Sequence, residues 1–198
     1  MNGEAVLALL RSRRVMRDFT PEPVAEEDLV AILEAGRWAS SGSNNRVHRF
    51  LVVRDPRRVG LVKAISPGML GSPPALILIC ADEREIAARE IRVERDRSIW
   101  IDVGTAAMNM MVEAHALGLG TCPTTSFSKP ALSAVLELPG HAAPRLFLQI
   151  GHPAVPLRPR PAAIGRWTRD NTYWERWGTT RPEASIPPNV ATRRSERA

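Results

Sequence analysis

Two short segments near the start of the chain carry the residue types of a site for a phosphorylated, ring-bearing molecule. Residues 13–19 read Arg-Arg-Val-Met-Arg-Asp-Phe, so three guanidinium groups fall within five positions at the end of an apolar helical run. Forked guanidinium donors bind a phosphate through two hydrogen bonds at once. Residues 38–50 read Trp-Ala-Ser-Ser-Gly-Ser-Asn-Asn-Arg-Val-His-Arg-Phe, whose short hydroxyl and amide side chains suit a polar heterocycle or a ribityl chain. Together the segments predict a cofactor site.

Each segment also has a simpler interpretation. An arginine-rich helix end is often a solvated face, because cations are favoured near a helix C-terminus. A cluster of Ser, Gly and Asn is often an ordinary loop. The binding interpretation depends on finding both segments together, about twenty residues apart, with further matches later in the chain.

The composition indicates one domain and narrows the class of partner. The chain has 198 residues, 44% of them hydrophobic, which is enough for one domain with a sizeable core. A net charge of +6 would permit binding to nucleic acid or to an anionic surface. Only 5% of the residues are aromatic, and we find no nucleic-acid recognition motif. We therefore expect no nucleic-acid partner, and assign part of the positive charge to an anionic cofactor.

Other classes of site lack their usual signatures. Cys80 and Cys122 are too few for a disulfide framework, and the four histidines lack metal-ligand spacing, so we expect no metal. Gly118-Leu119-Gly120 is followed by Thr-Cys-Pro, which does not continue the dinucleotide-binding glycine pattern. No apolar run reaches membrane length. We expect a soluble, cytoplasmic protein with no membrane partner.

The hydrophobic pattern predicts helices interleaved with four or so strands, in an α+β or three-layer α/β arrangement. The expected helices cover 4–13, 25–38, 59–65, 98–117 and 129–136, and the expected strands cover 49–54, 75–81 and 144–151. Segment 82–97 is charged and amphipathic. The continuous apolar run 75–81 is typical of a strand buried on both faces.

The helix expected over 98–117 has apolar residues on nearly every side. Such a helix must be buried, and in so small a chain this implies a subunit interface. Beyond residue 178 the sequence becomes polar and rich in Pro and Arg, which is typical of a linker or an arm.

In this order and spacing, four segments resemble the nitroreductase family of FMN-dependent oxidoreductases. Residues 13–19 resemble the family's opening Arg-Arg-Ser-x-Arg-x-Phe, and residues 38–50 its Ala-Pro-Ser-x-x-Asn-x-Gln-Pro-Trp-x-Phe. Residues 102–122 resemble its long central helix with the ending Leu-Gly-Leu-Gly-Thr, and residues 149–153 its Gly-Tyr-Pro turn. The resemblance runs from Ala5 to Gly178.

The resemblance implies an α+β fold of the nitroreductase type, a three-layer α-β-α sandwich with a central mixed sheet and a long buried dimer-interface helix. It implies an FMN-binding domain over 1–178 and a polar tail over 179–198. The family forms homodimers with two FMN sites at the interface, each lined by both subunits.

Carried over residue by residue, the resemblance assigns a set of cofactor-binding positions. They are Arg13, Arg14, Val15, Arg17, Ser40, Ser41, Asn44, Pro123, Thr124, Thr125, Ser126 and Arg166. Arg13 and Arg166 would hold the phosphate, Val15 would contribute only backbone, and Arg17 would face the pyrimidine edge of the flavin. Ser40, Ser41 and Asn44 would come from the partner subunit, and residues 123–126 would pass flavin N5 with a backbone N–H as donor.

Several positions depart from the family pattern and bear on the subfamily, and so on the substrate. Val15 replaces the usual Ser, Ser40 replaces Pro, and Arg46-Val47-His48 replaces Gln-Pro-Trp. Segment 65–74 is short and lacks the Asn or Lys of the family's later flavin contacts, and Thr125-Ser126 stands in place of Glu-Gly.

The activity implied is hydride transfer from NADH or NADPH to flavin N5, and then to a nitroaromatic, a quinone or a related small acceptor. Both reactants would stack on one face of the ring, which implies ping-pong turnover. The cofactor carries the chemistry, so we assign no catalytic side chain and give Arg17 the tuning of the ring. We expect His48 to be a structural residue. The alternatives are a flavin-binding or storage protein with little turnover, and a basic nucleic-acid-associated protein.

Overall fold

The computed structural model describes residues 3–92, 98–155 and 172–179. The chain divides into two compact units, Met1–Arg158 and Pro159–Ala198, and every helix and strand below belongs to the first. Arg166 and nearly all of the expected 179–198 tail lie outside the described residues. The domain boundary expected at residue 178 stays a prediction.

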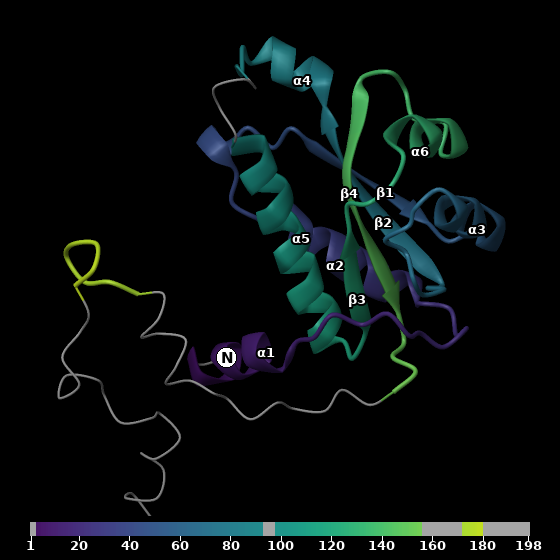
Figure 1. Ribbon diagram of the computed structural model, residues 1–198, viewed down its shortest axis with the longest axis horizontal. Helices are drawn as coiled ribbons and strands as arrows, with labels where there is room; N and C mark the ends of the chain where they lie inside the picture. Colours follow the sequence, from purple (N-terminus) through teal and green to yellow (C-terminus); the bar gives the residue numbers. More distant parts are fainter. Residues whose placement is uncertain (1–2, 93–97, 156–171, 180–198) are drawn as a thin grey trace, which may run out of the picture. The chain divides into compact units, whose positions relative to one another are not determined.

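Four strands form one sheet in the order β1-β2-β4-β3 (Figure 1). They are β1 (His48–Val53), β2 (Ala75–Asp82), β3 (Gly120–Thr124) and β4 (Ala142–Gly151). All three neighbouring pairs are antiparallel. The four strands themselves therefore form an antiparallel sheet. The parallel pairing that a mixed sheet requires is present, among the described residues, as the isolated bridge between Val15 and Thr121, beside β3.

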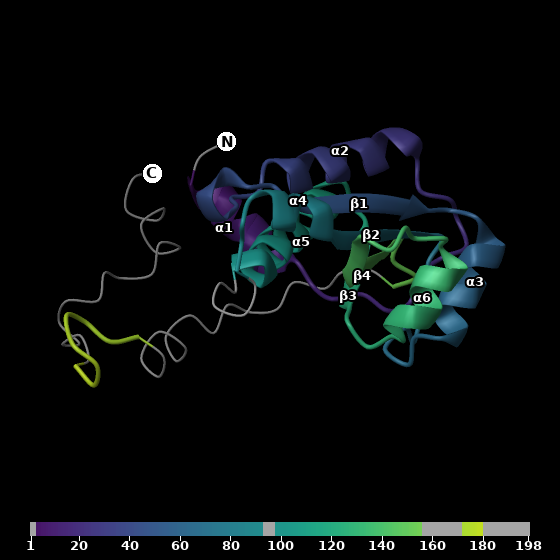
Figure 2. The same ribbon diagram turned by 90° about the horizontal axis from the view of Figure 1, so that it is seen from above.

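Helices cover both faces of the sheet, which confirms the three-layer α-β-α sandwich (Figures 1 and 2). One face packs against α2 (Glu26–Arg37) and α5 (Ser98–Ala116), and the other against α3 (Pro56–Ala64) and α6 (Lys129–Val135). The short helices α1 (Gly3–Ser12) and α4 (Glu83–Ala88) lie outside these layers.

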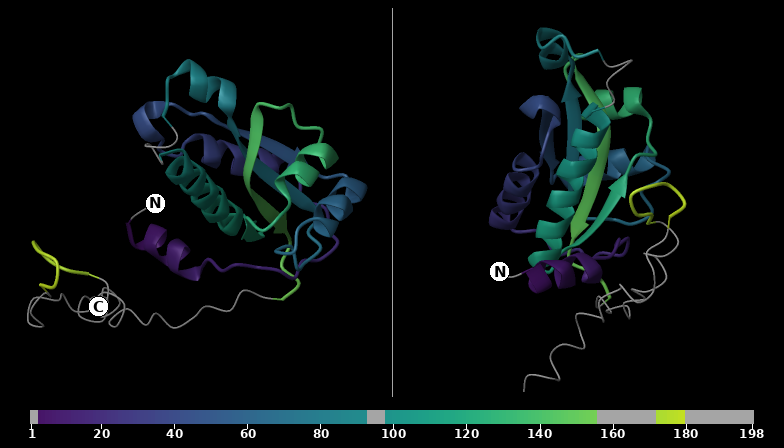
Figure 3. Two further views of the ribbon diagram at one scale, coloured as in Figure 1. Left: turned by 45° about the horizontal axis from the view of Figure 1, so that its top comes forward. Right: turned by 90° about the vertical axis from the view of Figure 1, so that its left-hand side faces the viewer.

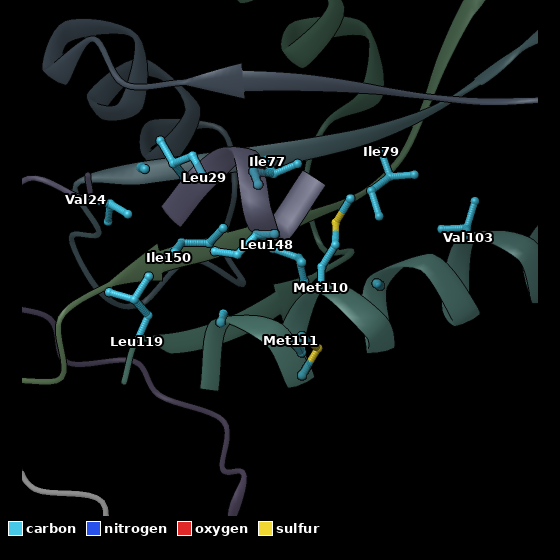
Figure 4. Packing of buried hydrophobic residues seen from close by; sticks show 14 residues of the cluster. Val24, Leu29, Ile77, Ile79, Val103, Met110, Met111, Leu119, Leu148 and Ile150 are labelled. Atoms are coloured by element: carbon cyan, nitrogen blue, oxygen red, sulfur yellow. The ribbon is translucent and has the colours of Figure 1, made fainter. Parts of the chain in front are cut away.

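Strand β2 supplies both cores, because its side chains alternate between the two faces. Ile77 and Ile79 face α2 and α5, together with Leu148 and Ile150 of β4 (Figure 4). Leu76, Leu78 and Cys80 belong to the core under α3 and α6. All eight residues of β2 are buried, as the continuous apolar run predicts.

Helix α5 has two apolar faces with different surroundings. One face is buried in the chain's own core and includes Met110 and Met111. The other leaves Ile101 65% and Met108 38% exposed in the single chain. The helix expected to be buried all round is thus buried on one side, and its second side is exposed in the single chain.

Helix α1 lies beside the C-terminal end of α5 and also exposes apolar side chains (Figures 1 and 3). None of its residues is buried, and Val6, Leu7 and Leu10 are each about two-fifths exposed. An isolated ten-residue helix is marginal in water. The exposed faces of α1 and α5 together form a candidate subunit interface.

Candidate cofactor site

Residues 13–17 run along the outer edge of β3. The backbone N–H of Met16 donates to the carbonyl of Thr121 at 2.8 Å, and Val15 forms the parallel bridge to the same residue. Gly120 permits this approach, because a Cβ there would lie 2.8 Å from the Cβ of Met16. The arginine-rich segment and β3 are therefore side by side, although a hundred residues separate them.

Arg13 is a partly buried cation without a counter-charge. Its Nε and Nη1 atoms are buried and have no hydrogen-bond partner, and it forms no ion pair with any described residue. The nearby His115 Nε2 lies 2.8 Å from Ser12 Oγ, and burial, then the charges of Arg13 and Arg14, lower the pKa of His115. Buried unpaired donors on a cation are costly. This guanidinium fits an anionic group such as a phosphate.

The other residues of the segment are placed differently. Arg14 folds back on its own backbone, with Nη1 donating to the carbonyl of Arg13 at 2.7 Å. Val15 is 41% exposed and offers only apolar surface. Arg17 is exposed, and its charge lowers the pKa of Cys122 on β3 against the larger, raising effect of burial. Arg17 is therefore close enough to β3 for its charge to affect Cys122.

The end of β3 is backed by a glycine-containing loop, residues 66–71, within the segment 65–74 that lacks the Asn or Lys of the family's flavin contacts. The Gly68 N–H donates to the carbonyl of Ser126 at 3.3 Å, and a Cβ on Gly68 would lie 3.0 Å from the Ser126 Cβ. A Cβ on Gly71 would lie 1.8 Å from the carbonyl oxygen of Arg17. The loop thus contacts both the Arg17 segment and residues 124–126. It contributes backbone rather than charged or amide side chains, which is why residue types alone did not identify it.

A buried polar pair fixes the end of β3. The Gln149 side chain is fully buried, and its Nε2 donates to Thr124 Oγ1 at 2.8 Å. Thr124 is buried, whereas Pro123, Thr125 and Ser126 are exposed. Residues 123, 125 and 126 are therefore presented on the surface by an anchored Thr124.

Two hydrogen bonds join the Ser40–Asn44 loop to α5. The Gly42 N–H donates to Asp102 Oδ1 at 2.9 Å, and Thr105 Oγ1 donates to the Ser40 carbonyl at 3.0 Å. Asp102 is only 3% exposed. These contacts involve backbone atoms, so the side chains of Ser41 and Asn44 are not used in binding α5.

The same loop is strained in its backbone. Ser43, Asn44 and Arg46 all have positive φ angles, of 49°, 55° and 49°. Residues other than glycine seldom adopt this conformation, and strain of this kind concentrates at functional sites. The geometry supports a binding role for the loop.

The two halves of the predicted site lie far apart within one chain. The Ser40–Asn44 loop sits over Asp102, whereas Arg13 is next to His115 at the other end of α5. Thirteen residues of α-helix span about 20 Å. The structure joins residues 15–16 to the start of β3 and links Arg17 to residues 124–126 through loop 66–71, and it does not bring Ser40, Ser41 or Asn44 to them. Arg166 lies outside the described residues.

His48 lies at the base of the Ser40–Asn44 loop, away from Arg13. It is 8% exposed, and its ring centroid is 5.1 Å from that of Phe50. Burial lowers its pKa, the Arg49 and Arg46 charges act in the same direction, and the Asp102 carboxylate opposes them. Burial and the two arginine charges therefore favour the neutral form of this packed ring.

A cavity of about 830 Å³ lies elsewhere, between the Pro21–Val24 segment and α3. Five prolines line it, and its polar positions are Arg54, Asp55, Lys63 and Ser72. None of the predicted site residues lines it. Among the candidate cofactor residues, Val15, Arg17, Pro123, Thr125 and Ser126 are exposed in the single chain.

The described ranges, 3–92, 98–155 and 172–179, contain neither a metal-binding cluster nor a membrane-spanning helix. No cluster of three His, Cys, Asp or Glu side chains there could hold a metal ion. No helix there is long and apolar enough to span a membrane.

Comparison with known proteins identifies relatives of this geometry. The model of the nitroreductase family matches residues 10–70 and 57–152. An FMN reductase [NAD(P)H] from Bacillus subtilis (strain 168) is 31% identical over 164 residues, covering 75% of this chain and 66% of the relative. An NADH dehydrogenase from Thermus thermophilus is 27% identical over 171 residues, covering 72% and 83%. The solved FMN-dependent nitroreductase from Clostridium difficile R20291 has a TM-score of 0.72 at 22% identity, covering 86% of this chain and 99% of that chain.

Proposed function

Because this chain belongs to the nitroreductase family, we propose that it is an FMN-dependent oxidoreductase that takes hydride from NADH or NADPH. The observation that carries the proposal is Arg13, a half-buried guanidinium whose Nε and Nη1 have no protein partner. FMN has one terminal phosphate, and charge-assisted hydrogen bonds to it would satisfy both atoms. The Bacillus subtilis relative, named as an FMN reductase, supports this assignment.

Different residues along β3 would contact different parts of FMN. Arg13 would bind the phosphate, with Arg14 adding positive charge and Arg166 as a proposed further ligand. The ring would be lined by Pro123, Thr124, Thr125 and Ser126. These residues lie at the end of β3 that is further from Arg13. Val15 would contribute backbone and apolar contact.

Arg17 would face the ring rather than the phosphate. It is exposed, and its charge acts on Cys122, two residues before Thr124. A fixed cation favours negative charge on the group it faces, more strongly where water is excluded. We assign Arg17 the role of adjusting how readily bound FMN accepts electrons.

FMN supplies, when bound, the ring atom N5 that accepts hydride and passes it to a second reactant. No side chain has to act as a general base. We propose that donor and acceptor use one position above the ring in turn, a ping-pong scheme, and that the acceptor is a nitroaromatic, a quinone or a related small molecule. The protein would act in the cytoplasm, where NADH and NADPH are available.

We propose a homodimer in which each site is completed by the partner's Ser40–Asn44 loop. Two observations support it: the loop is about 20 Å from Arg13 within one chain, and α5 and α1 expose apolar faces. The catalytic unit would be the FMN-binding domain over 1–178, with 179–198 as a tail.

The test is to purify the protein and identify its chromophore. We expect a yellow protein whose released cofactor is FMN and not FAD, and whose absorbance near 450 nm bleaches on anaerobic addition of NADH or NADPH. A yellow protein that neither reductant bleaches would instead be a flavin-binding or storage protein. A colourless protein that does not take up added FMN would refute the proposal.

A further inference from the structure

Two cations converge on one exposed indole next to the proposed ring site. The guanidinium carbon of Arg145 lies 4.7 Å from the ring centroid of Trp100, and Lys129 Nζ lies 5.9 Å from it. Trp100 is 48% exposed at the start of α5. We call Trp100, Lys129 and Arg145 the basic shelf.

The basic shelf lacks an acidic partner among the described residues. Neither Lys129 nor Arg145 forms an ion pair there, and Nε of Arg145 is buried without a hydrogen-bond acceptor. Six other described arginines do form ion pairs, such as Arg58 with Glu137 at 2.8 Å. The indole attracts each cation, whereas the two like charges repel each other, so an anion bound between them would relieve this repulsion.

Neither cation is explained by the element that carries it. Lys129 is the first residue of α6, where the helix dipole disfavours positive charge. Arg145 is an extra residue in β4: Ile79 pairs with Leu146 and Cys80 with Pro144, which leaves Arg145 without a partner opposite. Such bulges re-aim a side chain and are frequent next to active sites.

The basic shelf adjoins the residues proposed to line the flavin ring. Lys129 follows Ser126 by three positions. The last pair between β3 and β4 joins Thr124 to Phe147, and Arg145 precedes Phe147 by two residues, about 7 Å of strand. An anionic substituent on a reactant bound at Thr124–Ser126 would therefore be within reach of both cations.

We propose that the basic shelf binds the oxyanion of a ring-bearing reactant, and so gives the enzyme a preference for anionic aromatic acceptors such as carboxylated nitroaromatics. This inference rests on the proposed function for the position of the ring. Lys129 and Arg145 would supply charge-assisted hydrogen bonds, and Trp100 a stacking surface. The phosphate of NADPH carries the same chemistry and is the other possible source of the anion.

The binding test uses benzoate and its neutral analogue benzamide, titrated calorimetrically into the protein as purified. We expect Lys129→Met and Arg145→Met each to raise the Kd of benzoate by about fivefold or more, since each removes a charge-assisted contact. The Kd of benzamide should change less than twofold. Trp100→Leu should weaken both ligands alike.

A matched control removes the same charge elsewhere. Lys63→Met takes a lysine from the wall of the 830 Å³ cavity, and we expect it to leave benzoate binding unchanged. If Lys63→Met weakens benzoate and Lys129→Met does not, the anion binds in that cavity and the proposal is wrong. Equal benzoate affinity in wild type, Lys129→Met and Arg145→Met would also overturn it.

Steady-state kinetics then separate the two sources of the anion. If the acceptor carries it, Lys129→Met raises KM for 4-nitrobenzoate several-fold at constant kcat and leaves KM for nitrobenzene and for NADPH unchanged. If NADPH carries it, KM rises for NADPH and not for NADH. If Lys129→Met changes neither the KM for 4-nitrobenzoate relative to nitrobenzene nor the KM for NADPH relative to NADH, the proposal is wrong. If the wild-type protein contains no FMN, the proposed function is refuted. The benzoate titration tests anion binding by the basic shelf separately.

Discussion

Replacing Arg13 by Met should have opposite effects on cofactor binding and on the stability of the cofactor-free protein. The wild-type guanidinium holds two buried donors, Nε and Nη1, without partners. Met keeps an unbranched apolar stem that reaches about as far as Nε, and it removes the charge. The cofactor-free variant should therefore be at least as stable as wild type, because it no longer buries unpaired donors.

Binding of FMN should weaken by ten- to hundredfold. A hydrogen bond to a charged group contributes about 1.5–3 kcal/mol, and a factor of ten in Kd corresponds to about 1.4 kcal/mol. Two donors would give more than a hundredfold in a fully buried site, but Arg13 is only half-buried, so solvent screening reduces the effect.

The assay pairs flavin-fluorescence titration for Kd with urea unfolding of the cofactor-free protein. Arg11→Met is the matched control, since Arg11 is an exposed arginine two positions earlier and should change neither quantity. A variant that binds FMN as wild type does would show that Arg13 does not hold the phosphate. A variant with lower stability and unchanged affinity would show a purely structural role.

Three further predictions concern the core, the interface and pH. Gly36→Ala should lower the free energy of unfolding by about 1–3 kcal/mol in a urea titration, because the added Cβ would lie 2.2 Å from Met110 Cε. The control is Gly60→Ala, which is also in a helix but has open space around it and should raise the free energy of unfolding slightly. Met108→Glu should convert the dimer to a folded monomer by light scattering with loss of FMN, and a dimer of unchanged mass would exclude this face from the interface. Burial lowers the pKa of His48 below 6.5, so the unfolded chain binds the proton more readily and stability falls as pH drops below 6.5; His48→Phe should reduce that loss between pH 7 and 5.5, and an unchanged slope would show that His48 does not contribute to it.

The sequence predicted the layers of the fold well because long apolar patterns determine them. The helix expected over 25–38 is observed as Glu26–Arg37, and that over 98–117 as Ser98–Ala116. Strand β3 was missed. Its sequence, Gly-Thr-Cys-Pro-Thr, lacks alternation and contains Pro, which is tolerated here because β3 is an outer strand of the sheet with Pro123 exposed.

The candidate site was predictable only in part, because residue types identify charged ligands and not the scaffold behind them. Arg13 was found from its neighbours in the sequence, and its unpartnered donors support the choice. The support that Asp102 gives to Gly42 joins positions sixty residues apart, and no local pattern encodes it. Loop 66–71 contributes close backbone contacts, which depend on glycines that look like ordinary turn residues.

The extra residue in β4 makes the chemistry near the site depend on the length of the strand as well as on its composition. In a regular strand successive side chains alternate between faces, and a shift of one position reverses every side chain beyond it. Removing the extra residue opposite Ile79 and Cys80 would restore regular pairing and leave no unpaired position for Arg145 to occupy. A single codon deletion, with no substitution at all, would therefore change which charges border the proposed reactant site.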